Sequence, residues 1–158
     1  MRSRQILSVL FFTISAVGAS AQTQQRWVVL PQTEARRLIG AQLLGLPDKI
    51  AGTWAPKQDD VSAMEANFHQ VSVLSRKYQP GRQVENPIEY FRQYLGLLAG
   101  EKKRIYVSAF CGLNNNSLAP KYWRDHLFMI SDGGSCVWQA LYDVSAREFV
   151  GLSVNGFA

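Results

Sequence analysis

The last third of the chain, from Ile105 to Ala158, alternates apolar and polar residues between turn signals. Residues 105–111 form the clearest run, with aliphatic or small side chains at odd positions and aromatic or polar ones at even positions. Because successive side chains of a strand point to opposite faces of a sheet, this period of two predicts a β-strand. Three further strands are predicted over residues 126–131, 136–142 and 148–154. A chain with this ending has to fold around a sheet.

Short turns separate the last three predicted strands. The sequence Asp132-Gly133-Gly134-Ser135 can supply the positive φ angles that a tight hairpin needs. A second short turn is expected over residues 143–147. Because short connections join antiparallel neighbours, the four strands should form a sequential antiparallel meander.

Two amphipathic helices are expected ahead of this sheet. From Pro56, apolar residues recur at steps of three and four as far as Leu74, which predicts a helix of about five turns. A second helix should begin at Asn86, a good N-cap residue, with Pro87 in its first turn and an apolar side that extends to Leu98.

Residues 22–52 show no sustained periodicity. We expect an irregular, partly ordered arm with a short strand over residues 26–30 and a short helix from Thr33, because glycines and a proline interrupt any longer element. Residues 53–158 should then form a single α+β domain, with N-terminal helices packed on a C-terminal four-stranded antiparallel meander. In outline this order of elements resembles cystatin-like and NTF2-like rolls, which host inhibitors, binding modules and a few isomerases.

The first 21 residues have the features of an export signal. Arg2 and Arg4 precede an uncharged run over residues 6–17, and Ala21 closes a small-x-small cleavage motif. The run is shorter than the ~20 residues that span a bilayer. We therefore expect a cleaved signal peptide at residues 1–21 and a soluble periplasmic or secreted protein without a membrane span. An uncleaved amphipathic segment is the alternative.

The charge of the mature chain excludes one class of partner. Cleavage after Ala21 would remove two of the 17 basic residues and none of the 12 acidic ones, which leaves 137 residues with a net charge of +3. Nucleic-acid binders usually have a much stronger basic footprint, so no nucleic acid is expected as partner. A hydrophobic fraction of 47% argues against a disordered chain.

The sequence contains two cysteines, Cys111 and Cys136. In an exported chain such a pair is most simply a disulfide, which here would close the stretch of residues 112–135. A reactive thiol is the alternative, but the sequence has neither CxxC spacing nor a basic residue next to either cysteine.

Catalytic motifs are absent from the sequence. It contains no GxSxG, HExxH, Walker loop, GxGxxG or paired CxxC, and no cofactor or metal site is expected. One alternative is a small acid-base pocket centred on His126, which could face Asp132, Tyr142 or Asp143 from a neighbouring strand.

The favoured hypothesis is a binding or inhibitory module that uses an open sheet face and the loop over residues 112–125. If the helices cover one face of the sheet, aromatic and small polar side chains lie on the other and could form an adhesive patch. The candidate binding residues are Tyr106, Phe110, Gln139 and Phe149 on the sheet, and Tyr122 and Trp123 in the loop.

Two structural explanations compete with this hypothesis. The arm of residues 22–52 could simply cover the sheet face, and Tyr122 and Trp123 could anchor the loop onto the core. If the face is open, the expected partner is a protein or a small ligand of the cell envelope or the exterior, with a homodimer as a further possibility.

Overall fold

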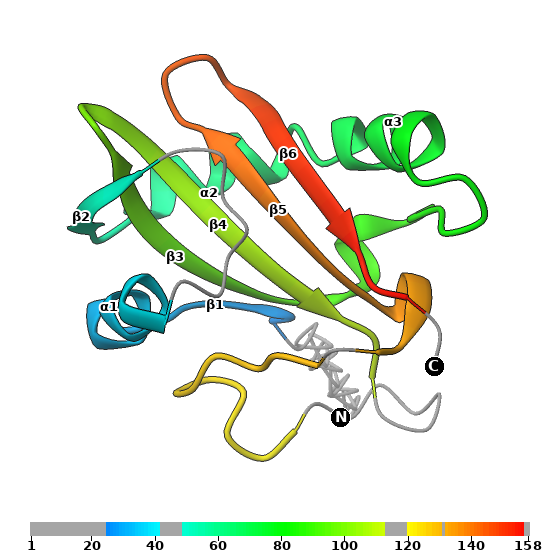
Figure 1. Ribbon diagram of the computed structural model, residues 1–158, viewed down its shortest axis with the longest axis horizontal. Helices are drawn as coiled ribbons and strands as arrows, with labels where there is room; N and C mark the ends of the chain where they lie inside the picture. The colour runs from blue at the N-terminus through cyan, green and yellow to red at the C-terminus, as the bar shows by residue number, and fades with distance from the viewer. Residues whose placement is uncertain (1–24, 42–48, 113–119, 131, 157–158) are drawn as a thin grey trace, which may run out of the picture.

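The computed structural model describes residues 25–41, 49–112, 120–130 and 132–156, and the predicted signal peptide lies outside this part. It is an α+β fold in which helices flank one mixed sheet (Figure 1). The elements, in chain order, are β1 (Trp27–Val29), α1 (Gln32–Ala41), β2 (Ile50–Trp54), α2 (Gln58–Glu65), α3 (His69–Tyr78), the 3₁₀ turn η1 (Pro87–Glu89), β3 (Phe91–Ala99), β4 (Lys102–Phe110), the 3₁₀ turn η2 (Gly134–Cys136), β5 (Val137–Asp143) and β6 (Glu148–Val154). None of the helices among the described residues is long and apolar enough to cross a bilayer.

The sheet has six strands in the order β1-β3-β4-β5-β6, and β2 also pairs with β3. All pairs are antiparallel except β1 with β3, which is parallel. The prediction of a four-stranded antiparallel meander is therefore wrong for the whole sheet. It holds for the consecutive strands β4, β5 and β6, which pair in antiparallel fashion. The turn between β5 and β6, residues 144–147, lies within the short turn expected over residues 143–147.

The predicted helix over residues 86–98 is wrong. The chain forms only the short turn η1 there and then β3, an inner strand of the sheet. It pairs with β4 on one side and with β1 and β2 on the other. Nearly every residue of β3 is buried, because both faces of the strand are covered. Such a strand is almost continuously apolar, and a helical spacing can be found in it by chance.

Gly96 allows β2 to pair closely with β3. A Cβ atom at this position would lie 2.2 Å from the carbonyl oxygen of Trp54, its partner in β2. Only a residue without a side chain fits so close an approach of two backbones. The Trp54 indole then donates to the carbonyl oxygen of Leu97 at 3.1 Å, which ties β2 to the strand it joins.

The helix predicted from Pro56 to Leu74 is divided into α2 and α3. Between them the backbone N–H groups of Asn67 and Phe68 each bond to a carbonyl three residues earlier, which tightens the chain into a turn. The predicted apolar stripe is nevertheless correct, because Val61, Met64, Phe68 and Val71 are all buried against the sheet.

The predicted hairpin between residues 126–131 and 136–142 is also wrong. Residues 126–130 form no strand, and β5 pairs instead with β4 and β6. Gly133 and Gly134 do have positive φ angles, of 108° and 54°, but they lead into η2 rather than into a two-strand turn.

The core lies on both faces of the sheet. The face predicted to lie under the helices is confirmed for most of its residues, but Val150, which was also placed there, is 39% exposed, and Leu152 is only partly buried. Residues from alternate positions of β4, β5 and β6 pack with α2 and α3. They are Ile105, Val107, Ala109, Trp138, Ala140 and Val154. On the opposite face, α1 packs over Leu95, Tyr106 and Leu141.

Phe149 lies on the helix-covered face, not on the face where the alternation placed it. The register of β5 and β6 shifts between Leu141 and Tyr142, which pair with Gly151 and Phe149. Val150 is the extra residue of this bulge and is 39% exposed. A single inserted residue turns the side chains that precede it in the strand to the opposite face of the sheet. For this reason Phe149 lies on the helix-covered face and stacks on Phe68, the residue just before α3.

The described part of residues 22–52 is ordered. The expected short strand and short helix are both present, as β1 and α1. Both β1 and β2 pair with β3, so this stretch belongs to the same sheet as the rest of the chain.

Candidate functional site

The sheet face that we predicted to be open is covered. Tyr106 is 3% exposed under α1, and Phe110 is 2% exposed among the aromatic side chains at the end of β4. Phe149 is buried on the other face, and Gln139 is half-buried. The alternative that the N-terminal arm covers this face describes the structure, and a binding role for these four residues stays a prediction.

Besides α1, the segment of residues 120–130 also covers this face, and it is not part of the sheet (Figure 1). The side chain of Gln93, in β3, forms hydrogen bonds to the backbone of this segment. The Gln93 amide nitrogen donates to the carbonyl oxygens of Trp123 and His126, and its oxygen accepts from the N–H of Phe128 at 2.7 Å. One fully buried side chain thus satisfies three backbone groups of the 120–130 segment.

Other side chains hold the same segment farther along. The Ser108 hydroxyl donates to the carbonyl oxygen of Phe128 at 3.1 Å, and the N–H of Leu127 donates to the Glu34 carboxylate at 2.9 Å. Because these bonds come from β3, β4 and α1, the segment has a fixed position although it pairs with no strand.

Trp123 anchors the start of the segment. It is 7% exposed and packs edge-to-face on Phe91, with ring centroids 5.3 Å apart, and on Phe110. The expectation that an aromatic residue here fixes the loop to the core is therefore confirmed for Trp123. Tyr122, next to it, is 57% exposed.

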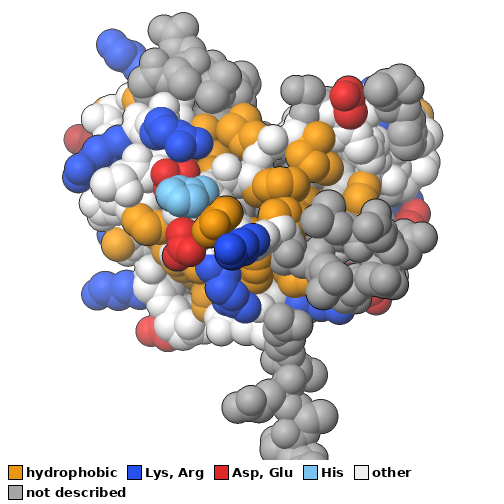
Figure 2. Space-filling model, turned by 90° about the horizontal axis from the view of Figure 1, so that it is seen from below, with side chains coloured by type: hydrophobic (Ala, Val, Ile, Leu, Met, Phe, Trp, Pro, Cys, Tyr) orange, Lys and Arg blue, Asp and Glu red, His pale blue; other side chains and the backbone are white. Residues whose placement is uncertain are grey.

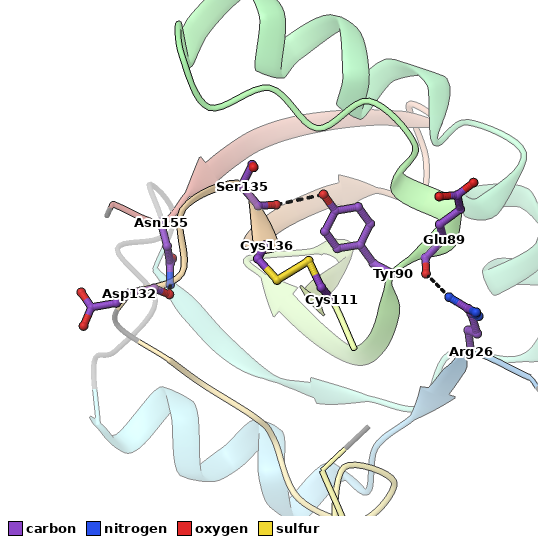
Figure 3. The surroundings of a disulfide bond; sticks show 8 residues. All are labelled: Arg26, Glu89, Tyr90, Cys111, Asp132, Ser135, Cys136 and Asn155. Atoms are coloured by element: carbon purple, nitrogen blue, oxygen red, sulfur yellow. Dashed lines mark hydrogen bonds between the residues drawn. A yellow bond between two sulfur atoms is a disulfide. The ribbon is translucent and has the colours of Figure 1, made fainter. Parts of the chain in front are cut away.

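The predicted disulfide between Cys111 and Cys136 is confirmed as a bonded pair close to this end of the sheet, with Cα atoms 5.1 Å apart (Figure 3). The N–H of Cys111 also donates to the carbonyl oxygen of Cys136 at 2.8 Å. Tyr90 lies beside the pair, and its hydroxyl donates to the carbonyl oxygen of Ser135 at 2.9 Å. The disulfide joins the end of β4 to the start of β5, on either side of the excursion that contains the 120–130 segment.

Large apolar side chains project from the outside of the 120–130 segment. Tyr122, Met129 and Ile130 are 57%, 42% and 40% exposed, and they are three of the seven large hydrophobic residues found exposed in the described part of the chain. Figure 2 views the molecule from this side and shows hydrophobic side chains near the middle of the face, with both basic and acidic side chains beside them. We call Tyr122, Met129 and Ile130 the apolar patch.

Basic groups accompany the apolar patch. Lys121 and Arg124 are exposed in the same segment, and the Lys121 ammonium lies 5.2 Å from the centre of the Tyr122 ring. Arg37 of α1, also exposed, lies 3.7 Å from the carboxylate of Glu34. Glu34 is largely buried and Asp125 of the segment is exposed, so Lys121, Arg124 and Arg37 outnumber the one exposed carboxylate here.

His126 lies on this surface, but its surroundings differ from those predicted. Its Nδ1 is 3.7 Å from the carboxylate of Glu34 on α1, not beside a carboxylate of a neighbouring strand. The imidazole is 64% exposed, and Asp143 is instead engaged with Arg104 at 2.9 Å. Neither of the two clefts described below is lined by His126. The geometry thus offers an exposed contact rather than a pocket for acid-base chemistry.

A groove of about 420 Å³ lies on the opposite side of the molecule, between α3 and residues 85–88. Glu65, Phe68 and Arg76 are among its lining residues. A second cleft of about 720 Å³ lies at the turn between β3 and β4, and its lining residues include Lys49, Glu101, Lys102 and Arg104. We refer to the first as the α3 groove.

A buried polar network lies behind the α3 groove. The Arg92 side chain is 3% exposed, and its Nε and Nη2 donate to the same Glu65 oxygen at 3.2 and 3.1 Å. The Tyr94 hydroxyl donates to that oxygen as well, and it accepts from Arg92 Nε at 2.9 Å. Burial, together with the Glu65 charge, raises the pKa of Tyr94 well above its usual value, so its phenol stays protonated at neutral pH.

Sequence reasoning found part of this arrangement. It singled out Tyr122, Trp123 and His126, but it missed Met129 and Ile130 because their stretch was interpreted as a strand. A signal was available: residues 127–130 are four consecutive apolar residues, and a strand with one solvated face cannot bury them all. The sequence around Gln93 and Glu34 contains no pattern that predicts their role, because the backbone groups to which they bond are far away in the sequence.

Within the described residues no group of three His, Cys, Asp or Glu side chains could hold a metal ion. No family model matches the chain, and neither the curated proteins nor the solved structures contain a match to it.

Proposed function

We propose that this protein is an exported binding module that holds an acidic protein partner against the 120–130 segment. The observation that carries the proposal is the apolar patch: three large hydrophobic side chains stand exposed on eleven residues whose backbone is held by buried side chains. Large apolar side chains left exposed on one short segment of fixed backbone mark a candidate interaction site.

The lack of a cleft along the 120–130 segment favours a protein over a small molecule as the partner. Small ligands bind in concave sites, and no residue of the 120–130 segment lines either of the two clefts described above. Tyrosine, methionine and arginine are enriched in protein interfaces, and the segment offers Tyr122, Met129 and Arg124. Because the backbone is already fixed, binding would cost little conformational entropy.

The charge around the patch favours an acidic partner. Lys121, Arg124 and Arg37 are all exposed on this surface. Of its carboxylates, Asp125 is exposed, while Glu34 is buried and already paired. Complementary charge at the rim of an interface mainly raises the association rate, and salt screens it.

Two observations support an extracytoplasmic location. The N-terminal 21 residues have the pattern of a cleavable signal, and Cys111 and Cys136 lie at bonding distance. On this basis the partner is a protein of the periplasm or the exterior.

The test is affinity capture from the extracytoplasmic fraction of the source organism. The double variant Lys121→Glu, Tyr122→Ser reverses one charge on the surface and removes one apolar side chain from it. A matched control exists on α3, where Lys77 lies over Tyr78 at 4.8 Å and Tyr78 is 58% exposed. The control variant is therefore Lys77→Glu, Tyr78→Ser.

We expect one acidic protein to be captured by the wild type and by the control, and lost with the Lys121→Glu, Tyr122→Ser variant. Capture should weaken as ionic strength rises. Equal loss with both double variants, or capture that neither variant reduces, would contradict the proposal.

A further inference from the structure

The α3 groove lies on the far side of the sheet from the 120–130 segment, and it combines a charged floor with apolar walls. Phe68 is buried in the floor, whereas Val73 and Ile88, on opposite sides, are 52% and 58% exposed. The charged group in the floor is Glu65, whose side chain is 20% exposed.

Glu65 is held in one position by the network behind it. Arg92 and Tyr94 direct three donors at Oε1, while no hydrogen bond to Oε2 is found among the described residues. One oxygen therefore fixes the carboxylate, and the other is left to accept a hydrogen bond from the groove. Such a fixed acceptor favours a charged donor, because charge-assisted hydrogen bonds are the stronger ones.

Arg92 also joins the floor of the groove to the wall that carries Ile88. Besides Glu65 at the end of α2, its guanidinium donates to the carbonyl oxygen of Ile88, on that wall, and to that of Tyr90 behind the groove. It lies 5.5 Å from the centre of the Phe68 ring. Because one buried side chain joins the floor to the wall that carries Ile88, this part of the groove is fixed before any ligand arrives.

We propose that the α3 groove binds an extended peptide segment through a lysine or arginine side chain, whose cationic group bonds to Glu65 and whose alkyl chain packs against Phe68 and Ile88. The basic side chains of the groove do not oppose this: Arg76 is paired with Glu85 at 3.2 Å, and Arg92 already bonds to Glu65 and to two backbone carbonyls. The site is independent of the acidic partner proposed for the other face.

A peptide fits the groove better than a free amine does. Polar side chains also line it away from Glu65, namely His69, Asn86 and the exposed Arg76–Glu85 pair. These groups can bond to the N–H and C=O groups of an extended chain, whereas an alkylamine could use only Glu65. The exposed Val73 would contact an apolar residue next to the basic one.

The test is NMR titration of the full mature chain with three probes: acetyl-Leu-Lys-Leu-amide, the same peptide with acetylated lysine, and hexylammonium. We expect the first peptide to shift the amide signals of residues 65–76 and 85–88. Acetylation of the lysine should weaken binding about tenfold, because the charged donor is lost. Hexylammonium should bind more weakly than the peptide.

Ile88→Ser removes one exposed wall of the groove without touching the core, and it should weaken peptide binding about fivefold. Val150→Ser, on β6, is the matched control and should leave binding unchanged. Glu65→Gln should abolish the preference for the charged peptide, and its folding can be checked on the same spectra. No shifts in the groove, equal binding of the acetylated peptide, or hexylammonium as tight as the peptide would each overturn the proposal.

Discussion

The side-chain oxygen of Gln93, fully buried in β3, accepts a hydrogen bond of 2.7 Å from the backbone N–H of Phe128. The two residues are 35 positions apart, and the 120–130 segment depends on this contact and on the two bonds that the Gln93 amide nitrogen donates. The buried amide of Gln93 supplies the hydrogen bonds that a neighbouring strand would otherwise make to this backbone. The outer side of the segment stays exposed to solvent.

Replacing Gln93 should therefore destabilise the fold and release the segment. Gln93→Leu keeps the volume of the side chain but leaves three backbone groups without partners, which should lower the free energy of unfolding by about 3 kcal/mol. Chemical denaturation measures this loss. Hydrogen exchange at Phe128 should accelerate in the same variant.

The control is Gln139→Leu, because Gln139 is half-buried and makes only a 3.4 Å contact with Asn155. Its cost should stay below about 1 kcal/mol. Equal costs for the two glutamines would show that Gln93 does not support the segment.

Asp143 should make the stability depend on acid pH. Burial acts to raise the pKa of this carboxyl, but the N–H of Ala146 and the guanidinium of Arg104 outweigh it and lower the pKa below its usual value. A carboxyl whose pKa is lower in the folded state contributes stability above its unfolded pKa, about 3.9, and loses it as the pH falls through the folded value. Unfolding free energy should thus decrease as the pH is lowered below about 5.

Asp143→Asn should remove that part of the pH dependence and should cost about 3 kcal/mol at neutral pH, since it breaks a buried ion pair. Asp125→Asn, at an exposed position, is the comparison. If both variants keep the wild-type acid profile, the Arg104–Asp143 pair has no role in it.

The disulfide should contribute by constraining the unfolded chain. Cys111 and Cys136 are 25 residues apart, and a loop of that size corresponds to about 3.5 kcal/mol in the loop-entropy model. The double variant Cys111→Ser, Cys136→Ser should lose about this much in denaturant unfolding. A reducing agent should lower the stability of the wild type but not that of the variant, and an unchanged wild type would argue against the bond.

The buried tyrosines should limit stability at alkaline pH. Burial raises the pKa of Tyr94 and of Tyr106 above the usual value of about 10. Each phenol favours the folded state below its unfolded pKa, and that contribution is lost as the pH rises above about 10. Tyr94→Phe should cost about 1 to 2 kcal/mol at neutral pH through its lost bond to Glu65, whereas Tyr106→Phe should cost less.

The measurement is the free energy of unfolding as a function of pH for the wild type and for both variants. Each variant should flatten the alkaline decrease because it removes one buried phenol. An alkaline profile that neither substitution changes would contradict this account.

The sequence predicted the parts of the fold that local patterns encode. The alternation from Ile105 to Phe110 identified β4 and both of its faces, and the apolar stripe of Val61 to Val71 identified the faces of α2 and α3. Here the period of the pattern and the burial agree, because each element has one covered and one less covered side.

The errors arose where tertiary contacts decide. β3 is covered on both faces, so its sequence has no alternation, and the contact of Gly96 with Trp54 is visible only in the fold. Residues 127–130 have strand-like composition, but Gln93 and Ser108 occupy the bonding groups that a neighbouring strand would have used. The bulge at Val150 moved Phe149 to the other face, and no turn signal in the sequence announces it.

The central claim is that a partner protein rests on the apolar patch, and photo-crosslinking in the source organism tests it most directly. A photoreactive amino acid would be placed at Met129, 42% exposed on the patch, and in a separate variant at Val150, 39% exposed on β6. We predict one discrete crosslinked protein from position 129 that disappears when Lys121→Glu and Tyr122→Ser are added, and none from position 150. The absence of a crosslink from position 129, or the same product from both positions, would contradict the account.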